Sequence, residues 1–237
     1  MSTFIAFYCS TPVDFLEYIL QNSAAPSTIV VCSSREAFLE RIDVSIRESL
    51  DGNISRPMEE DAPRPQHALL LPTIHLLAKS RAIDLAFTPT LQHLRAYLAI
   101  QTANRVENCV TEAHGISSLH SSMLAILGLL DIHRSTSEFS AQGLSRTLSI
   151  AVEASMALGR KFVIADILPS IEDKDAMATD GIENEVQPDP WMEQIPILNG
   201  SIRSGDEERV WAGRTIELAR IVGRWCRVVN LGEDPSH

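Results

Sequence analysis

The stretch Met123 to Arg146, "MLAILGLLDIHRSTSEFSAQGLSR", joins a continuous apolar run to a single aspartate, Asp131, and a polar segment that starts near Arg134. An unbroken apolar run of this length is typical of a strand that is buried on both faces, as in a parallel sheet. We predict a buried strand that ends at Asp131, then a loop, then a long helix over residues 141–159. An aspartate at the end of such a strand can hold Mg²⁺ beside a nucleotide, provided that the chain also has phosphate-binding parts.

On both sides of this stretch, short apolar runs alternate with segments of helical period. The alternation predicts strands joined by crossover helices in a mostly parallel sheet covered on both faces, which is a three-layer α/β fold. The expected strands are "TFIAFYCS" (3–10), "STIVVCSS" (27–34), "AIDLAF" (82–87) and "KFVIADI" (161–167). The expected helices cover residues 13–20, 35–50, 67–80 and 91–100.

The C-terminal part of the chain has a different pattern. Residues 195–203 and 211–229 alternate apolar and polar side chains, with glycines at turns. This pattern predicts antiparallel strands added at one edge of the sheet. The proline-rich and acidic segments 51–66 and 170–190 are expected to be flexible loops. The length and composition favour a single domain over residues 1–237.

Charge and cysteine content narrow the function classes. The formal net charge of −11 opposes tight binding of nucleic acid by the whole surface, because phosphate neutralisation needs clustered Lys and Arg. The four cysteines form no Cys-x-x-Cys pair, so we expect neither a disulfide framework nor a zinc ribbon. The longest wholly apolar run, residues 123–130, is too short to span a membrane, and the N-terminus lacks a basic leader. We therefore expect an intracellular protein with no membrane association.

The sequence offers no recognisable phosphate-binding loop. Such a loop needs a lysine between a glycine and Ser or Thr, but none of the lysines Lys79, Lys161 and Lys174 follows a glycine. The turn after the first expected strand, "CSTPVDF", contains no glycine that would let backbone amides wrap a phosphate. This absence favours a structural role for Asp131.

Other catalytic patterns are also missing. Ser145 in "GLSRT" lacks the second glycine of a nucleophile elbow and falls in a helical stretch. The histidines show no spacing of a zinc site. We expect no catalytic residue, no cofactor and no metal, and hence a protein that is not an enzyme. A small-molecule enzyme stays open as an alternative, with a pocket at the strand ends lined by Asp131, His133 and Asp166.

Arginine supplies nearly all the positive charge, and many arginines lie near tryptophans in the C-terminal region. Guanidinium and indole groups suit phosphate contacts, base stacking and protein interfaces. The alternative is a solvated loop or strand face whose arginines pair with nearby glutamates. The nucleic-acid candidates are Arg134, Arg146, Arg203, Arg214 and Arg224, and the interface candidates are Trp191, Trp211 and Trp225.

The order of these parts resembles the ATPase core of RecA-type recombinases and their eukaryotic paralogues. In that family a strand ends in the Walker B aspartate, a DNA-facing loop follows, a helix and a strand lead to a second DNA loop, and a terminal hairpin completes the sheet. The matching segments here are the expected strand to Asp131, the loop "HRSTSEFSAQGLSR", the helix "TLSIAVEASMALG", the strand "KFVIADI", and then "PILNGSIR" and "WAGRTIELARIVGRW".

The departures from the family pattern imply a RecA-like fold that has lost ATP hydrolysis. The first turn lacks the phosphate-binding loop, and the second strand offers Ser34 and Glu36 where the family has a strand-end glutamate. On this resemblance Asp131 is a Walker B remnant.

Degenerate chains of this size resemble two groups of assembly subunits. One is the recombinase paralogues of the Shu complex, which assist recombinase filaments on single-stranded DNA in homologous recombination repair. The other is the RecA-like subcomplex of Elongator, which acts in tRNA wobble-uridine modification. The resemblance favours the first group and implies a nuclear hetero-oligomer with other RecA-like paralogues, in contact with single-stranded DNA; the second group leaves a cytoplasmic location open.

Overall fold

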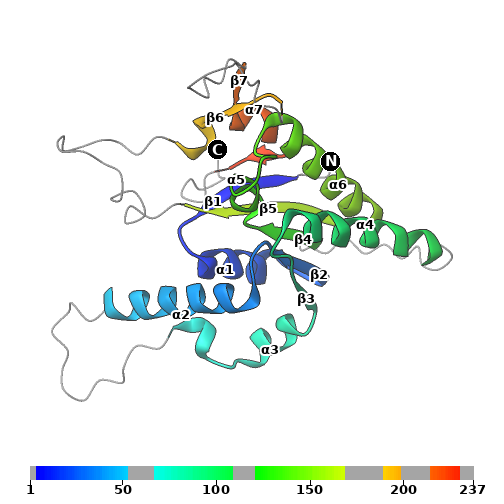
Figure 1. Ribbon diagram of the computed structural model, residues 1–237. Coiled ribbons are helices and arrows are strands. Elements are labelled where there is room, and N and C mark those ends of the chain that lie inside the picture. Colours follow the sequence, from blue (N-terminus) through cyan, green and yellow to red (C-terminus); the bar gives the residue numbers. More distant parts are fainter. Residues whose placement is uncertain (1–3, 53–66, 109–120, 169–188, 199–213, 230–237) are drawn as a thin grey trace, which may run out of the picture.

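The structure is a computed structural model that describes residues 4–52, 67–108, 121–168, 189–198 and 214–229. Its centre is a sheet with the strand order β3-β2-β4-β5-β1-β8, in which every neighbouring pair is parallel (Figure 1). The strands are β1 (Ile5–Cys9), β2 (Ser23–Val31), β3 (Ile83–Phe87), β4 (Ser121–Leu127), β5 (Lys161–Ile167) and β8 (Arg227–Val228).

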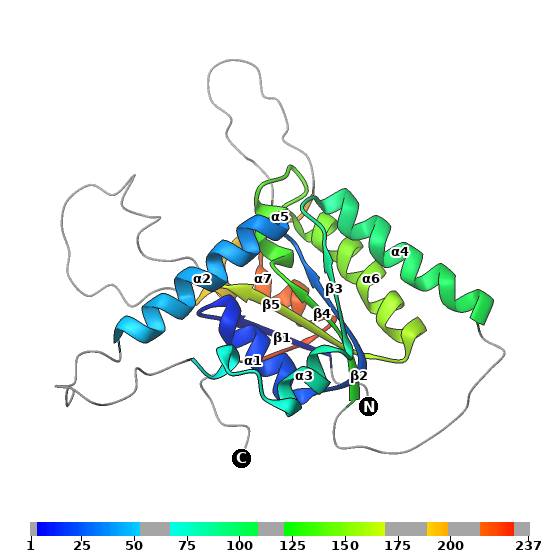
Figure 2. The ribbon, with the colours of Figure 1, turned by 90° about the horizontal axis from the view of Figure 1, so that it is seen from below.

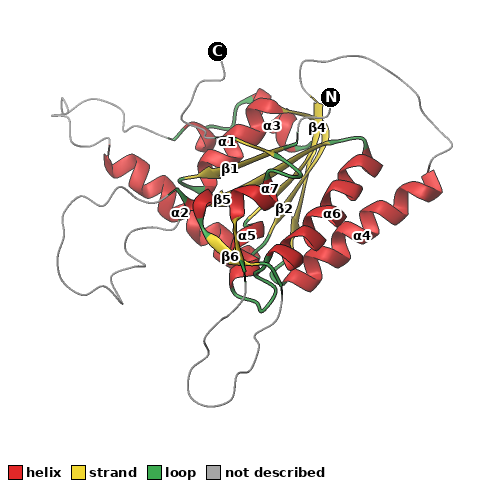
Figure 3. Cartoon of the chain, turned by 90° about the horizontal axis from the view of Figure 1, so that it is seen from above, coloured by secondary structure: helices red, strands yellow, loops and turns green. Residues whose placement is uncertain are grey.

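Helices cover both faces of this sheet. The lower face carries α1 (Pro12–Asn22), α2 (Arg35–Gly52) and α3 (Ile74–Ser80), as Figure 2 shows from below. The upper face carries α4 (Leu91–Asn108), α6 (Ala141–Leu158) and α7 (Leu218–Val222), as Figure 3 shows from above. The predicted three-layer α/β fold with a mostly parallel central sheet is therefore confirmed.

Strand β4 explains why a continuous apolar run can sit in this sheet. Successive side chains of a strand point to opposite faces. Met123, Ala125 and Leu127 pack below the sheet with residues of α1 and α2. Leu124 and Ile126 pack above it with residues of α4 and α6. Both faces of β4 are buried from Met123 to Leu127, so none of these positions favours a polar side chain.

The predicted strand to Asp131 is wrong at its carboxyl end. Strand β4 ends at Leu127, and Gly128 adopts a left-handed conformation with φ of 82°. This conformation strains residues that carry a Cβ, so the glycine marks the point where the chain leaves the strand. A short helix, α5 (Leu129–Arg134), follows at once and contains Asp131 in its first turn.

The C-terminal strands differ from the prediction in their position. Strands β6 (Gln194–Pro196) and β7 (Thr215–Glu217) are antiparallel, but they form a separate two-stranded sheet. The strand that joins the edge of the central sheet, β8, runs parallel to β1. Helix α7 lies between β7 and β8 in the chain.

The expected helix over residues 67–80 is interrupted. A short 3₁₀ helix (Ala68–Leu70) precedes Pro72, and α3 starts only at Ile74 with the Thr73 side chain as its N-cap. Proline lacks an N–H group and disfavours helical geometry at the residue before it, which accounts for the break.

Parts of the two predicted loops belong to ordered elements. In segment 51–66, the first two residues complete α2, and in segment 170–190 the last residue starts a 3₁₀ helix (Pro190–Met192). The other residues of both segments lie outside the described residues, apart from Asp189, which caps that 3₁₀ helix. None of the helices that the structure describes has both the length and the apolar content to cross a membrane.

Candidate functional site

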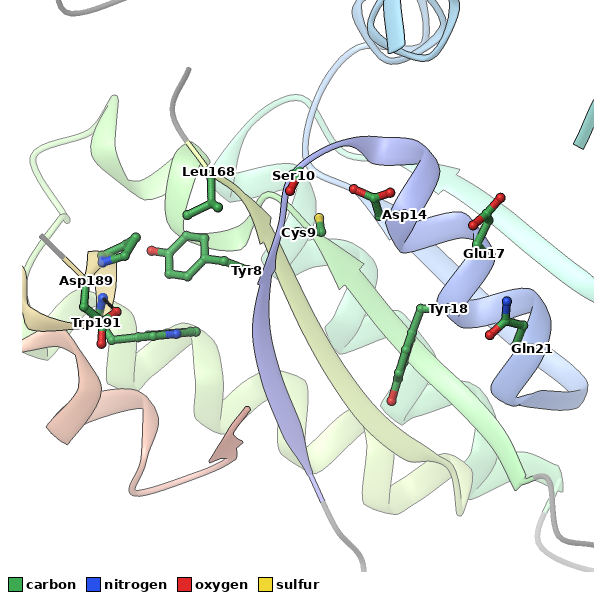
Figure 4. A pocket seen from close by; sticks show the side chains of 11 residues that line it. Tyr8, Cys9, Ser10, Asp14, Glu17, Tyr18, Gln21, Leu168, Asp189 and Trp191 are labelled. Carbon is green, nitrogen blue, oxygen red and sulfur yellow. Dashed lines mark hydrogen bonds between the residues drawn. The ribbon is translucent and has the colours of Figure 1, made fainter. Parts of the chain in front are cut away.

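A cleft of about 790 Å³ lies at the carboxyl ends of β1, β2, β4 and β5, with α2 along one side. Ligands of open α/β sheets usually bind at this edge. The charged groups that line the cleft are Glu40, Arg41, Glu48, Asp131 and Arg134. A second cavity of about 660 Å³ lies around the end of β1 (Figure 4).

The N-terminus of α1 faces this edge and is closed by side chains of its own first turn. The backbone N–H of Thr11 donates to the Asp14 carboxylate at 2.8 Å, and the backbone N–H of Asp14 donates to the Thr11 hydroxyl at 3.2 Å. Pro12, the first helical residue, has no N–H to offer. A phosphate at this turn would compete with the Asp14 carboxylate for the Thr11 N–H and with the Thr11 hydroxyl for the Asp14 N–H.

The N-terminus of α5 is closed by a carboxylate from a distant strand. Asp166 of β5 is 1% exposed, and its carboxylate accepts hydrogen bonds from the backbone N–H groups of Leu130, at 3.0 and 3.2 Å, and Asp131, at 3.1 Å. Because Gly128 bends the chain where β4 ends, these two amide groups point at the neighbouring strand. Asp166 therefore supplies the cap that α5 lacks in its own sequence.

Burial governs the protonation of Asp166. It raises the pKa of this carboxyl to about 7, against the hydrogen bonds from Leu130 and Asp131, which favour the ionised form. The same buried region raises the pKa of the Cys9 thiol to about 12, through burial and the nearby Asp166 charge. Cys9 is thus an unreactive thiol that donates to the Asp166 carbonyl at 3.5 Å.

Asp131 is exposed and lines the cleft, four residues beyond the end of β4. A Walker B aspartate would stand at the strand end itself, where this chain has Leu127 and Gly128. The predicted position of Asp131 at the strand end is wrong, and its interpretation as a Walker B remnant stays a prediction. Its backbone N–H, bonded to Asp166, has a clear structural role.

The other two members of the expected pocket do not line the cleft. Asp166 is covered by α5, and His133 is fully buried on the side of α6. His133 Nε2 lies 3.0 Å from the Thr147 hydroxyl, and Nδ1 lies 3.2 Å from the Glu138 carbonyl oxygen, which requires a proton on Nδ1. Burial lowers the pKa of His133 to about 4, so the imidazole is neutral at pH 7.

Arg134 is engaged within the protein. Its guanidinium pairs with the Glu193 carboxylate at 2.6 Å and lies 5.7 Å from the centre of the Phe139 ring. Burial opposes its charge, but the hydrogen bond to Glu193 and the nearby Tyr8 hydroxyl together hold its pKa above the usual value. Arg134 thus joins α5 to the segment before β6, and its contact with nucleic acid stays a prediction.

Three predicted arginines are exposed near α6 and α7. Arg146 lies in α6, Arg214 precedes β7, and Arg224 follows α7. The backbone N–H of Ile197 donates to the Arg214 carbonyl at 3.1 Å, and the Ile197 carbonyl accepts from Gln142, one turn before Arg146, at 3.0 Å. Arg203 lies outside the described residues.

The tryptophans occupy different environments. Trp191 is buried against Tyr8, with ring centroids 4.6 Å apart, so it cannot serve as an exposed interface residue (Figure 4). Trp225 is half-buried, and its indole Nε1 makes no hydrogen bond with the described residues. Trp211 lies outside the described part of the chain.

Asp166 is the residue that the sequence analysis did not single out as a cap. The available signal was an acidic residue inside the otherwise apolar strand "KFVIADI".

Among the described residues, no three His, Cys, Asp or Glu side chains come together as a metal site would need.

No curated protein shows significant similarity to this chain. Residues 2–173 match the SPAC22G7.03-like family. The matched region runs from β1 through β5 and includes both closed helix N-termini, Thr11 to Asp14 and the α5 cap Asp166. Since the match covers most of the sequence, the chain belongs to the SPAC22G7.03-like family.

Proposed function

We propose that this protein is a non-catalytic subunit of a nuclear hetero-oligomer that acts on nucleic acid, of the recombinase-mediator type that its sequence resembles. The observation that carries the proposal is the closure of both helix N-termini at the carboxyl edge of the sheet. Nucleotide-binding folds hold phosphate with free backbone N–H groups at such positions. Here the Asp14 carboxylate accepts from the Thr11 N–H and the Thr11 hydroxyl accepts from the Asp14 N–H. The Asp166 carboxylate accepts from the N–H groups of Leu130 and Asp131.

Electrostatics at this edge support the same proposal. Asp14 and Asp131 are exposed beside the cleft, and Glu40 and Glu48 line it from α2. These carboxylates repel the negative charges of a nucleoside triphosphate, and the two cleft arginines do not outnumber them. A subunit built in this way contributes surfaces to an assembly and leaves phosphate chemistry to its partners.

The exposed arginines Arg146, Arg214 and Arg224 support contact with nucleic acid. The backbone hydrogen bonds through Ile197 bring the segment of Arg214 beside the first turns of α6. The net charge of −11 over the whole chain disfavours binding by the isolated protein and suits a protein that reaches nucleic acid together with a partner.

The test is a salt titration of the complex assembled from the full chain and the partners that co-purify with it, bound to single-stranded DNA. We expect the triple variant R146A/R214A/R224A to weaken binding and to lower the slope of log K against log salt by roughly 2. The matched control is R35A/R41A/R47A, which removes the same charge from exposed positions on α2, across the sheet. If both triple variants gave the same slope, Arg146, Arg214 and Arg224 would not form the contact with nucleic acid. A greater loss of binding affinity with transfer RNA than with DNA would assign the complex to tRNA modification.

A further inference from the structure

Strand β3 ends the central sheet and has one free edge. The backbone N–H of Ser27 donates to the Ala82 carbonyl at 3.0 Å, and that of Thr88 donates to the Val31 carbonyl at 2.8 Å, so these even-numbered positions face β2. Backbone groups alternate in direction along a strand. The N–H and C=O groups of Ile83, Leu85 and Phe87 therefore point away from β2, and no described residue bonds to them.

The surface beside this edge is apolar and uncovered. Leu85 is 49% exposed at the middle of β3, and α3 exposes Leu77 and Ile74, the latter to 86%. Seen from below, α1, α2 and α3 leave the ribbon of β3 free (Figure 2). An apolar edge strand with unpaired backbone groups is an efficient template for another strand.

We propose that two copies of this chain pair through their β3 strands, antiparallel and around a two-fold axis at Leu85, to form one continuous sheet. This inference goes beyond the proposed function and does not depend on it. A strand pairs with its own copy when its free backbone groups and its side chains are both symmetric about one residue.

The free backbone groups of β3 meet the first condition. With Leu85 opposite Leu85 of the second copy, both residues direct N–H and C=O toward the axis and exchange two hydrogen bonds. Ile83 then lies opposite Phe87 of the second copy, and these residues also face outward. Every hydrogen-bonded position of the antiparallel ladder is thereby filled by a residue with free groups.

The side chains meet the second condition. The sequence "IDLAF" places large apolar residues at both ends and at the centre. Asp84 faces Ala86 of the second copy, so the one charge of the strand meets a small neutral side chain. A register centred on Asp84 would also pair the outward-facing groups of Ile83 and Leu85, but it would place two carboxylates directly opposite each other at the closer, non-hydrogen-bonded spacing. The register centred on Leu85 avoids this repulsion and pairs the three large apolar residues of β3 with one another.

The first test is sedimentation equilibrium of the full chain, which should show a dimer of 26.1 kDa chains. We expect Leu85→Lys to raise the dimer dissociation constant at least about tenfold, because two like charges then meet on the axis. The control is Leu39→Lys on α2, where the leucine is equally exposed at 50% and the dimer should persist. A wild-type monomer in the high micromolar range, or a dimer that Leu85→Lys leaves intact, would overturn the proposal.

A second test locates the axis. An equimolar mixture of the Leu85→Lys and Leu85→Glu variants should form a heterodimer, since a lysine then faces a glutamate across the two-fold. If each variant is monomeric and the mixture stays monomeric, Leu85 does not lie on the axis and the proposed pairing is wrong.

A third measurement needs no variant and so does not depend on whether the substituted chains fold. Hydrogen exchange of the amides of Ile83, Leu85 and Phe87 should slow as the protein concentration rises, because these groups become bonded only in the dimer. The proposal would be contradicted if hydrogen exchange at these amides did not depend on protein concentration. It would also be contradicted if β3 were found paired only with a strand of another protein.

Discussion

Helices α1 and α5 start at the same edge of the sheet, and both have N-terminal amides that donate to side chains, but the accepting side chains lie at different distances along the sequence. In α1 the cap is local, from Thr11 and Asp14, and it is exposed. In α5 the cap comes from Asp166, far along the chain on β5, and it is fully buried. The first cap stabilises one helix, whereas the second also ties α5 to the sheet.

The difference in burial has a thermodynamic consequence. Water solvates the Asp14 carboxylate, so its charge carries no large desolvation cost. Asp166 has lost that water, and its ionised form depends on the amides of Leu130 and Asp131. The buried cap is thus sensitive to substitution and to pH.

The largest effect should come from Asp166→Ala. This change leaves the buried amides of Leu130 and Asp131 without an acceptor, and we expect the free energy of unfolding to fall by about 3 kcal/mol. Asp166→Asn keeps an acceptor oxygen at the same place and should cost much less at pH 7. Chemical denaturation of both variants measures the difference. Equal losses in the two variants would show that the hydrogen bonds to α5 are not what Asp166 contributes.

The second effect is a pH dependence that belongs to Asp166. Its pKa in the folded state, about 7, lies above the ordinary aspartate value of 3.8, so the folded chain binds more protons between these pH values. The stability that this carboxyl contributes is therefore complete below about pH 4 and is lost as pH rises through about 7. Relative to the wild type, Asp166→Asn should gain up to about 2 to 4 kcal/mol between pH 4 and pH 8.

Denaturation of both proteins across this pH range measures the effect of Asp166, since all other titrating groups, His133 included, are the same in the two chains. A difference that does not change with pH would mean that the carboxyl titrates alike in the folded and unfolded states.

The smallest effect concerns the local cap. Thr11→Ala removes the acceptor for the Asp14 amide, and we expect a loss of about 1 kcal/mol. Ser10→Ala, at the exposed residue just before the cap, is the control and should be neutral. A loss as large as that of Asp166→Ala would remove the distinction between the two caps.

The same contrast explains how far the sequence could predict the fold. The alternating apolar runs and helical segments predict the parallel sheet and its helices, because each signal lies within one element. The end of β4 could not be placed in this way. The apolar run continues through Leu129 and Leu130 into α5, and only the left-handed Gly128 separates the strand from the helix.

The candidate site was predicted less well, for a related reason. The turn after β1, "CSTPVDF", contains no glycine, and in the structure Thr11 and Asp14 form a local capping box there. The partners of Arg134, His133 and Asp166 are distant in sequence, and no local pattern identifies them. Their roles depend on how β5, α5 and the segment before β6 come together.

The most direct test of the central claim, that the chain's own carboxylates close the phosphate positions, is equilibrium binding of a fluorescent ATP analogue in the presence of Mg²⁺. We expect no saturable binding of the ATP analogue by the wild-type chain and no phosphate release from ATP. Saturable binding that unlabelled ATP displaces would contradict it, because a nucleotide would then occupy an edge where Asp14 and Asp166 already hold the helix amides.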